Sequence, residues 1–408
     1  MYLAESNATM NSKELIYLDY NSTTPVDKEV VEKMVPYFHE VPGNAASRSH
    51  PFGWIAEEAV DNGRKKLAEL IKVDPKEIVF TSGATEGDNL ILKGVFEMYY
   101  RKGKHIITLE TEHKAVLDAC QKIEKLGGEV SYLKVNRDGL VDLDELEKEI
   151  REDTILVSIM WANNETGVIQ PMKEIGALCE KKGVLLMSDA TQAVGKINVY
   201  PKDVGVHLMA FSAHKMYGPK GVGAIYVCQK NPRVKITSQI DGGGHERGMR
   251  SGTLNVPGIV GFGQASLLAQ NTIDNDQKRI QKLRDRLEKG LSTIEESYVN
   301  GKGAPRLYNV LNIAFRFVES EALIATFNQT IAVSTGSACT SASLDPSHVL
   351  IGMGLSEDMA YSSIRFSLGK YTTEEEIERT LILVQKGVQK LRQSSPIWEM
   401  FKEGIDVS

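Results

Sequence analysis

The sequence predicts an α/β protein with a large domain, built on a mostly parallel seven-stranded sheet flanked by helices, and a smaller α+β domain. In the middle of the chain, short apolar runs alternate with amphipathic stretches of helical period, which implies parallel strands joined by crossover helices. After Gly301–Pro305 the pattern changes to strand-like runs followed by a long amphipathic stretch. The 408 residues are enough for two domains of roughly 100–200 residues each.

Seven apolar runs are the expected strands of the large sheet. They are Ile78–Thr81, His105–Leu109, Val130–Val135, Ile155–Met160, Val184–Ser188, Leu208–Ser212 and Val222–Val227. Helical periodicity lies between several of them, as in Ala115–Leu126 and Met172–Lys182. From about Ile259 to Ser297 the pattern is helical and highly charged. We therefore predict a large domain over residues 15–265 and a small domain over residues 266–408, with the first residues able to pack against the small domain.

The small domain is expected to contain strands at Val310–Phe315, Ile331–Val333 and Ser363–Leu368. The clearest helix is Thr372–Arg392. It opens with a capping-box pattern, Thr372 and Glu375, and then repeats apolar residues at helical spacing.

Composition excludes several classes of protein. A net charge of −6 gives no electrostatic basis for broad nucleic-acid binding. The four cysteines are far apart and form no CxxC pair, which argues against a disulfide framework or a structural zinc site and is typical of a reducing compartment. No uninterrupted apolar run approaches the roughly 18 residues of a membrane span, and the first fourteen residues resemble no targeting peptide. We expect a cytoplasmic protein that does not bind membranes.

Polar residues follow five of the predicted strands. These groups are Ser82–Glu86, Thr111–His113, Asn163–Glu165, Asp189–Gln192 and Ser212–Lys215. In open parallel sheets, ligands bind beyond the carboxyl ends of the strands. One turn rich in polar residues could arise by chance, but five groups on the same edge indicate a single site.

Three of these groups suggest a phosphorylated pyridine cofactor. Ser82–Glu86 opens a helix and suits either a phosphate or an ordinary N-cap by Ser82 or Thr85. Lys215 is either a solvent-facing lysine or, with a lowered pKa, an amine that forms a Schiff base. Asp189 follows a buried strand and needs a cationic or hydrogen-bonding partner, such as a protonated pyridine nitrogen.

Three further residues have two interpretations each. His113 either bonds to its own helix turn or takes part in chemistry. Arg365 lies between apolar neighbours, so it faces solvent or meets a buried anion such as a substrate carboxylate. Cys339 has only small neighbours, which favours an accessible, reactive thiol. The remaining cysteines, Cys120, Cys179 and Cys228, are expected to be packing residues.

Together these segments resemble the cysteine desulfurases of the IscS/NifS type, in the class-V aminotransferase family of fold-type I pyridoxal-phosphate enzymes. The resemblance runs from about Ile16 to Trp398. Its most specific stretches are Thr81–Glu86, Thr111–Val116, Ser212–Lys215, Gly242–Thr253 and Gly336–Ser341.

The resemblance implies that Lys215 bonds covalently to pyridoxal 5′-phosphate, that His113 stacks on its ring and moves protons, and that Cys339 is the nucleophile. The resemblance also implies that Asp189 contacts the ring nitrogen and Gln192 the ring oxygen. Asn164 contacts the cofactor and, together with Arg365, the substrate carboxylate. The implied phosphate contacts are Ala84, Thr85, Ser212 and His214, joined by Thr253 from a second subunit.

The implied reaction converts L-cysteine to L-alanine and leaves the sulfur as a persulfide on Cys339, for iron–sulfur cluster assembly and possible tRNA thiolation. Implied partners are a second copy of the chain, an iron–sulfur scaffold protein and other sulfur acceptors. IscS-type proteins typically continue past the position of Ser408 in a tail that helps bind the scaffold. We expect no resident metal, although Cys339 could ligate a cluster transiently.

Three residues depart from the family pattern: Met187 replaces a histidine, Gly87 a serine and Ala45 a proline. Some motifs resemble NifS and others IscS, which leaves the sub-type open. The alternatives are a selenocysteine lyase, an aminotransferase, a nucleotide-binding enzyme or an inactive scaffold. Cys339 argues against an aminotransferase, and no strict phosphate-loop motif supports a nucleotide-binding enzyme.

Overall fold

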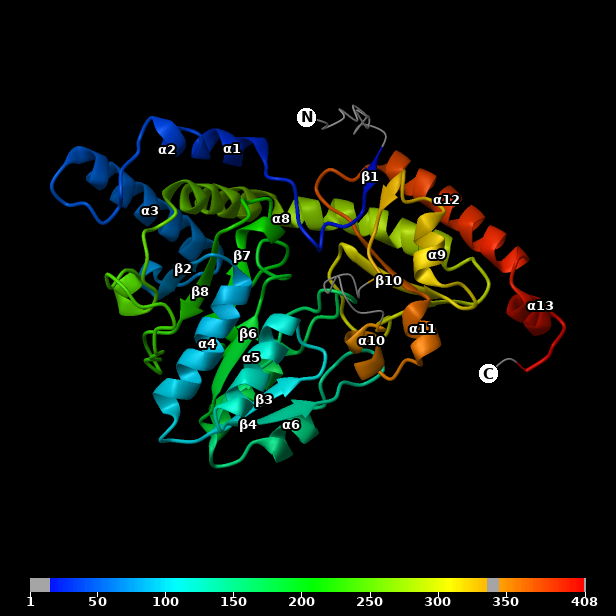
Figure 1. Ribbon diagram of the computed structural model, residues 1–408, viewed down its shortest axis with the longest axis horizontal. Helices are drawn as coiled ribbons and strands as arrows, with labels where there is room; N and C mark the ends of the chain where they lie inside the picture. The colour runs from blue at the N-terminus through cyan, green and yellow to red at the C-terminus, as the bar shows by residue number, and fades with distance from the viewer. Residues whose placement is uncertain (1–14, 336–344, 407–408) are drawn as a thin grey trace, which may run out of the picture.

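The computed structural model describes residues 15–335 and 345–406, and it confirms the predicted fold class (Figure 1). A seven-stranded sheet has the order β2-β8-β7-β6-β5-β3-β4. Its strands are β2 (Ile78–Thr81), β3 (His105–Leu109), β4 (Glu129–Leu133), β5 (Thr154–Ser158), β6 (Leu185–Asp189), β7 (Leu208–Ser212) and β8 (Gly223–Val227). Only β8 runs antiparallel to its neighbours within this sheet, so the sheet is mostly parallel, as expected.

The interior strands are buried along their whole length because helices cover both faces of the sheet. Every residue of β5 and β7 is buried, which explains their continuous apolar character. The helices around this sheet are α1 (Lys28–Met34), α2 (Pro36–His39), α3 (Pro51–Leu70), α4 (Ala84–Tyr99), α5 (Lys114–Lys125), α6 (Leu143–Glu149) and α7 (Met172–Lys182).

A second group of strands forms the smaller part of the molecule. In the three-stranded antiparallel sheet, β10 (Val310–Phe315) lies between β12 (Ser363–Ser367) and β9 (Ser297–Val299). The accompanying helices are α9 (Ser320–Ala325), α10 (His348–Gly352), α11 (Glu357–Tyr361), α12 (Glu374–Gln393) and α13 (Pro396–Lys402). The sequence did not indicate β9, which is short and only partly buried.

The start of the chain packs with this smaller part. Strand β1 (Ile16–Tyr17) pairs in parallel with β11 (Ile331–Ala332), and Ile16 and Leu18 belong to the same apolar cluster as the residues of β10 and β12. This pairing carries the chain directly into Asp19–Thr24, next to the end of β12.

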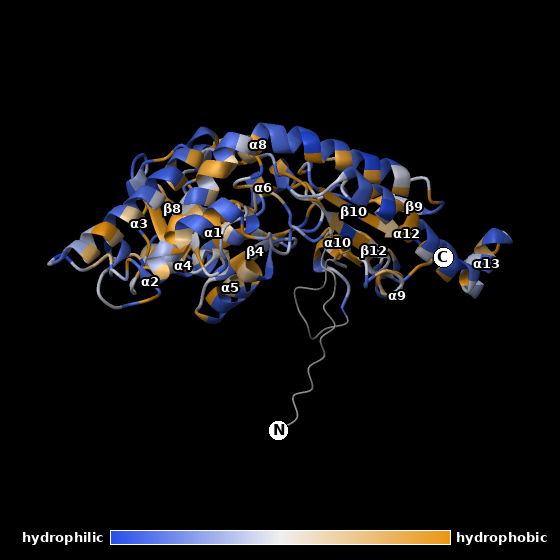
Figure 2. Cartoon of the chain, turned by 90° about the horizontal axis from the view of Figure 1, so that it is seen from above, coloured by the Kyte–Doolittle hydropathy of each residue, from blue (hydrophilic) through white to orange (hydrophobic). Residues whose placement is uncertain are grey.

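Helix α8 (Val256–Leu291) is 36 residues long and contacts both apolar clusters. Its first half packs into the core of the large sheet through Ile259 and Phe262, and its second half packs into the smaller core through Leu283 and Leu287. Figure 1 shows it running across both parts, and Figure 2 shows hydrophilic residues along its outer side. The boundary predicted after residue 265 falls inside this helix, and it stays a proposal.

The capping box of α12 is shifted by one residue from the prediction. Thr373 caps the helix and Glu376 completes the box, whereas Thr372 and Glu375 were expected. Thr372 is buried, and its hydroxyl instead accepts the backbone N–H of Gly369 at 3.0 Å, which closes the preceding turn.

Within residues 15–335 and 345–406, we find no helix with both the length and the apolar character that crossing a membrane requires. Cys120, Cys179 and Cys228 are buried free thiols, as expected for packing residues.

Candidate active site

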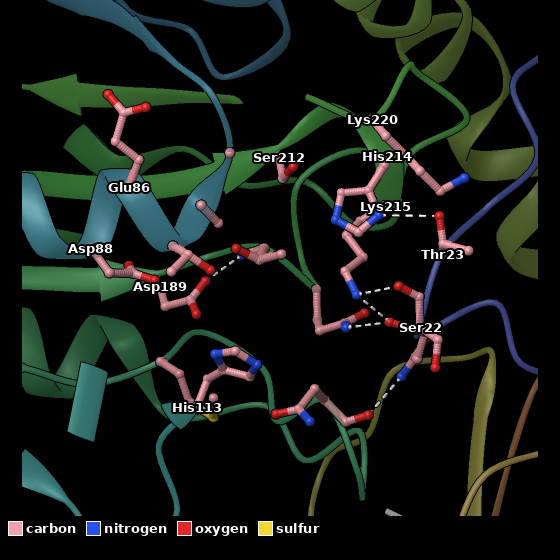
Figure 3. A pocket seen from close by; sticks show the side chains of 18 of the residues that line it. Ser22, Thr23, Glu86, Asp88, His113, Asp189, Ser212, His214, Lys215 and Lys220 are labelled. Atoms are coloured by element: carbon pink, nitrogen blue, oxygen red, sulfur yellow. Dashed lines mark hydrogen bonds between the residues drawn. The ribbon is translucent and has the colours of Figure 1, made fainter. Parts of the chain in front are cut away.

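A cavity of about 630 Å³ opens at the carboxyl edge of the large sheet (Figure 3). Three of the five predicted strand-end groups, Ser82–Glu86, Asp189–Gln192 and Ser212–Lys215, contribute several residues each. Thr111–His113 contributes His113, and Asn163–Glu165 contributes Asn164. The predicted site residues that line the cavity are Ala84, Thr85, His113, Asn164, Asp189, Gln192, Ser212, His214, Lys215 and Arg365. Thr253 is exposed and does not line it, and Cys339 lies outside the described residues.

Lys215 extends into this cavity from the single turn that follows β7. Its Nζ donates to the backbone oxygens of Asn21 at 2.6 Å and Ser22 at 2.7 Å. The alternative of a solvent-facing lysine is wrong, because the side chain is partly buried and held by these carbonyl groups. The amine is thus fixed where a carbonyl carbon in the cavity could meet it.

Asn21 is a site residue that the sequence did not reveal. It is 1% exposed, and its Nδ2 donates to the backbone oxygen of Asn164 at 3.0 Å. Its own backbone oxygen accepts from Lys215 and from Gln192 Nε2. The only sequence signal was a polar run, residues 19–24, that follows an apolar run. Asn21 therefore joins the first residues of the chain to the carboxyl edge of the large sheet.

The opposite end of the cavity is suited to a phosphate. β2 ends at Thr81 and α4 begins at Ala84, and the N-cap residue is Gly83, which has no side chain to cap the helix. The proposed N-caps, Ser82 and Thr85, do not cap it. Unsatisfied N–H groups in the first turn of a 16-residue helix favour an anion.

Close packing brings this turn to the strand beside it. A Cβ atom at Gly223 would lie 2.6 Å from the Cα of Gly83, so only glycine allows β8 to pass so near. Glu86 fixes the same turn by accepting the backbone N–H of Ser82 at 2.7 Å while pairing with Arg250. Burial acts to raise the pKa of Glu86, but these bonds to Arg250 and Ser82 outweigh it and lower that pKa.

His214 and Lys220 lie near the same end of the cavity. His214 Nδ1 is 3.1 Å from the hydroxyl of Thr23, as Figure 3 shows. Burial, together with Lys215, Lys220 and Lys196, lowers the pKa of His214 to about 4. The imidazole is therefore neutral near pH 7, and it acts through hydrogen bonding rather than through charge.

Three carboxyl groups, those of Asp189, Asp88 and Glu112, lie close enough to interact electrostatically. Asp189 accepts the backbone N–H of Thr191 at 2.9 Å. Asp88 is 1% exposed, and neither of its oxygens has a hydrogen-bond partner among the described residues. Burial, Asp189 and Glu112 raise the pKa of Asp88 well above its usual value, and burial likewise raises that of Glu112. Burial thus favours the protonated forms of Asp88 and Glu112. Asp189, which ends β6 and lines the cavity, is the carboxyl group suited to a pyridinium nitrogen.

His113 fits both of its interpretations. It is the N-cap of α5, where its Nδ1 accepts the backbone N–H of Ala115 at 3.1 Å, and it also lines the cavity. Because Nδ1 accepts, the neutral ring carries its proton on Nε2. His113 is thus oriented by the helix that it caps and retains a ring nitrogen for chemistry.

Arg365 reaches the cavity from the interior of β12 and is only 2% exposed. The solvent-facing interpretation is wrong, since its guanidinium is buried and donates to Asp19 at 2.7 Å and also to Ser22 and the backbone of Asn164. Binding of a substrate carboxylate stays a prediction. Its Nε has no hydrogen-bond partner among the described residues. The arginine is therefore fixed in place with a donor still available.

Two of the departures from the family pattern involve tight packing. A Cβ atom at Gly87 would lie 2.8 Å from Cγ2 of Ile225, so a serine could not enter unless the Ile225 side chain shifted. Met187 is fully buried in the core of the large sheet, and does not line the cavity. Ala45 packs against the edge of the same core.

These residues fit pyridoxal 5′-phosphate. An uncapped helix terminus suits the phosphate, Asp189 suits the ring nitrogen, and Lys215 suits the aldehyde. Two features of the chain itself support this fit. The carboxyl group of Asp88 is buried without a hydrogen-bond partner among the described residues, and α4 has no side-chain cap at its start. Both border the cavity.

A family model for the class-V aminotransferases matches residues 16–380. A cysteine desulfurase IscS from Glaesserella parasuis serovar 5 (strain SH0165) is 57% identical over 397 residues, which is 96% of this chain and 97% of that protein. The IscS of Pectobacterium carotovorum subsp. carotovorum (strain PC1) is 56% identical over 398 residues, with the same coverage.

Solved structures agree. A NifS-like protein superposes with a TM-score of 0.85 at 39% identity, over 92% of this chain and 100% of that chain. A protein named SspA, solved in complex with cysteine, superposes with a TM-score of 0.78 at 33% identity, over 88% of this chain and 100% of that chain. The sub-type that the motifs left open is thus of the IscS kind, and the alternative of a nucleotide-binding enzyme is wrong. The chain belongs to the class-V aminotransferase family, among its pyridoxal-phosphate-dependent IscS cysteine desulfurases.

Proposed function

We propose that the protein removes the sulfur atom from L-cysteine, releases L-alanine, and receives the sulfur as a persulfide on Cys339. The observation that carries this proposal is the anchoring of the segment that contains Cys339. One end is hydrogen-bonded to a residue that lines the cavity, and the other end to the chain neighbours of two residues that line it.

On the N-terminal side, Ser334 exchanges two backbone hydrogen bonds with Arg365, at 2.7 and 3.2 Å. On the C-terminal side, Ser347 donates to Glu165, the neighbour of Asn164, and His348 Nε2 lies 2.9 Å from the backbone oxygen of Glu112, the neighbour of His113. The chain thus leaves and rejoins the described structure beside the cavity.

Chain length allows the thiol to reach the substrate. Cys339 follows Thr335 by four residues, and four residues span at most about 14 Å at roughly 3.3–3.6 Å each. Ser334, the residue just before Thr335, pairs with Arg365, and Arg365 lines the cavity. A reach of this length from Thr335 therefore covers the cavity.

The residues of the cavity divide the work. When bound, the cofactor supplies an electron sink that weakens the bonds around the substrate Cα. Arg365 and Asn164 hold the substrate carboxylate, and His113 moves a proton through Nε2. The Cys339 thiolate attacks the substrate sulfur, so that an S–S bond forms and the C–S bond breaks. The electron pair of the C–S bond stays on carbon, which takes up protons to become alanine.

The test supplies cysteine and a thiol reductant, and measures alanine and sulfide together. The wild-type enzyme should release them in equal amounts. A Cys339→Ala variant should lose both while it keeps the visible absorption of the bound cofactor. Cys179→Ala is the matched control, because it removes a thiol that is buried and has no proposed role in the reaction. Normal product formation by Cys339→Ala would exclude Cys339 as the nucleophile.

We further propose a cytoplasmic homodimer that delivers its sulfur to an iron–sulfur scaffold and to other acceptor proteins. Thr253 would complete the phosphate site of the second subunit. In support, Thr253 is exposed, while the segment before it is fixed by a buried pair of hydrogen bonds, 2.7 and 2.8 Å long, between Arg64 and Glu246. Sedimentation analysis tests the dimer, and transfer of labelled sulfur from the persulfide to a purified scaffold protein tests the acceptor.

A further inference from the structure

Lys196 is a buried lysine that the reaction described above does not use. It is 6% exposed, and no carboxylate pairs with it in residues 15–335 or 345–406. A buried ammonium group without a counter-charge is costly, so such a lysine needs another explanation.

Its amine makes two hydrogen bonds. Nζ donates to Oε1 of Gln192 at 2.5 Å and to Oδ1 of Asn21 at 3.2 Å. The turn between Gln192 and Lys196 depends on Gly195, which has a φ of +77° and would otherwise place a Cβ atom 2.7 Å from Met216. The backbone is therefore built to return Lys196 beneath Gln192.

These bonds decide which way the Gln192 amide faces. With Oε1 held by Lys196, Nε2 must point the other way, where it donates to the backbone oxygen of Asn21 at 3.0 Å. The same oxygen accepts from Lys215 at 2.6 Å. The amide NH₂ group and the Lys215 amine thus converge on one atom.

We propose that Lys196 is a positioning residue that fixes the Gln192 amide with its NH₂ group toward the ring oxygen of the cofactor. In pyridoxal phosphate that oxygen is on the carbon next to the one that carries the aldehyde, so a group beside Lys215 is correctly placed to bond to it. The inference rests on the function proposed above, and adds a residue that does not line the cavity.

Burial disfavours the charged form of Lys196. Together with Lys215 and Arg365, it lowers the pKa of Lys196 well below the usual value. A neutral amine still donates hydrogen bonds, so the contacts to Gln192 and Asn21 do not depend on a charge. Combining substitutions at Lys196 and Gln192 distinguishes an effect that passes through Gln192 from a field acting on the cofactor.

The visible absorption of the cofactor–lysine chromophore gives the readout. The ring oxygen becomes more negative when the nitrogen that joins Lys215 to the cofactor loses its proton, so a donor to that oxygen lowers the pH midpoint of the band shift. Lys196→Met and Gln192→Leu should each raise the midpoint by about one pH unit, the equivalent of one hydrogen bond. The double variant should rise no further than Gln192→Leu alone.

Lys202→Met, which removes a lysine paired with Glu77 away from the cavity, is the matched control and should leave the midpoint unchanged. Without cofactor, Lys196→Met should unfold at the same or a higher temperature than the wild type at pH 7, because the lowered pKa of the buried lysine opposes folding below its unfolded-state pKa. If the variant is unstable, Lys196→Gln keeps a donor at shorter reach, and should shift the midpoint less than Gln192→Leu does.

An unchanged midpoint in Lys196→Met, or a shift that adds to that of Gln192→Leu, would overturn the positioning role. If the wild-type protein itself formed no visible chromophore, the proposed function would fail instead. Alanine production by the wild type, measured on the same samples, separates the two failures.

Discussion

The two sheets supply the cavity in different ways. The large sheet contributes side chains at or just after the ends of its strands, such as Asp189 at the end of β6 and Lys215 after β7. The small sheet contributes Arg365 from the interior of a strand, together with the segment at Asp19 that pairs with it. The first arrangement repeats from strand to strand, whereas the second depends on contacts between distant parts of the chain, such as those of Arg365 with Asp19 and Ser22.

That difference separates what the sequence could predict from what it could not. Polar residues after apolar runs identified every strand-end group, because parallel strands bring their carboxyl ends to one edge. Asn21 was missed because its role comes from pairing between β1 and β11, more than 300 residues apart along the chain. Asp88 was missed because it lies inside a helix, two residues beyond the predicted group Ser82–Glu86.

The strand pattern was also easier to predict than the helix ends. All seven strands of the large sheet were found to within about two residues, since buried parallel strands are apolar throughout. The cap of α12 was misplaced because two adjacent threonines both had a glutamate three residues later, and burial of Thr372 decided between them. The roles of Thr253 and Cys339 stay predictions.

The largest effect should come from the edge of the large sheet. Lys215→Ala should lower the rate of alanine formation by roughly 10³-fold or more, because it removes the amine that the backbone oxygens of Asn21 and Ser22 hold in the cavity. Borohydride treatment followed by mass analysis should show no cofactor attached to the variant. Lys182→Ala, a surface lysine paired with Glu147, should behave as the wild type. Trapped cofactor in Lys215→Ala would assign the amine to another residue.

The next effect tests the small sheet. Arg365→Lys should lower kcat/KM by roughly 10²-fold, mainly through KM, because lysine cannot reproduce the planar fork that binds a carboxylate. Steady-state rates over a range of cysteine concentrations give the two constants. Arg392→Lys is the control, since Arg392 is equally buried but bonds to backbone oxygens elsewhere, and it should affect stability without raising KM. Equal effects on KM would make Arg365 purely structural.

A substitution of Asp88 should have a smaller effect, on the free energy of unfolding, and that effect should change with pH. Its pKa is raised in the folded protein, so the wild type loses stability as pH rises from about 4 toward that raised value. Asp88→Asn removes this loss. Its free energy of unfolding relative to the wild type should therefore increase with pH by up to about 1.4 kcal/mol per unit.

Denaturant titrations of cofactor-free protein at pH 5, 6.5 and 8 would measure this trend. The groups that face Asp88 are Asp189 and Glu112, and both oppose its ionisation. A pH-independent difference between the two proteins would mean that Asp88 is already ionised in the fold.

Glu86, two residues before Asp88 on α4, should show the opposite sign. Its pKa is lowered, so its pairing with Arg250 stabilises the fold above the usual pKa of a glutamate and is lost as pH falls through the lowered value. Glu86→Gln should cost about 1 kcal/mol at pH 7 and nearly nothing at pH 3. The same titrations give the measurement, and an equal loss at both pH values would point to packing rather than charge.

Helix α8 is shared by the two halves of the molecule. At 1.5 Å per residue, its 36 residues form a helix about 54 Å long. A chain cut after residue 265 would leave Ile259 and Phe262 on a stub, while the other fragment would carry Leu283 and Leu287 on a helix without its beginning. Neither core keeps its full covering after such a cut, so one continuous helix is shared by the part that carries Lys215 and the part that carries Arg365.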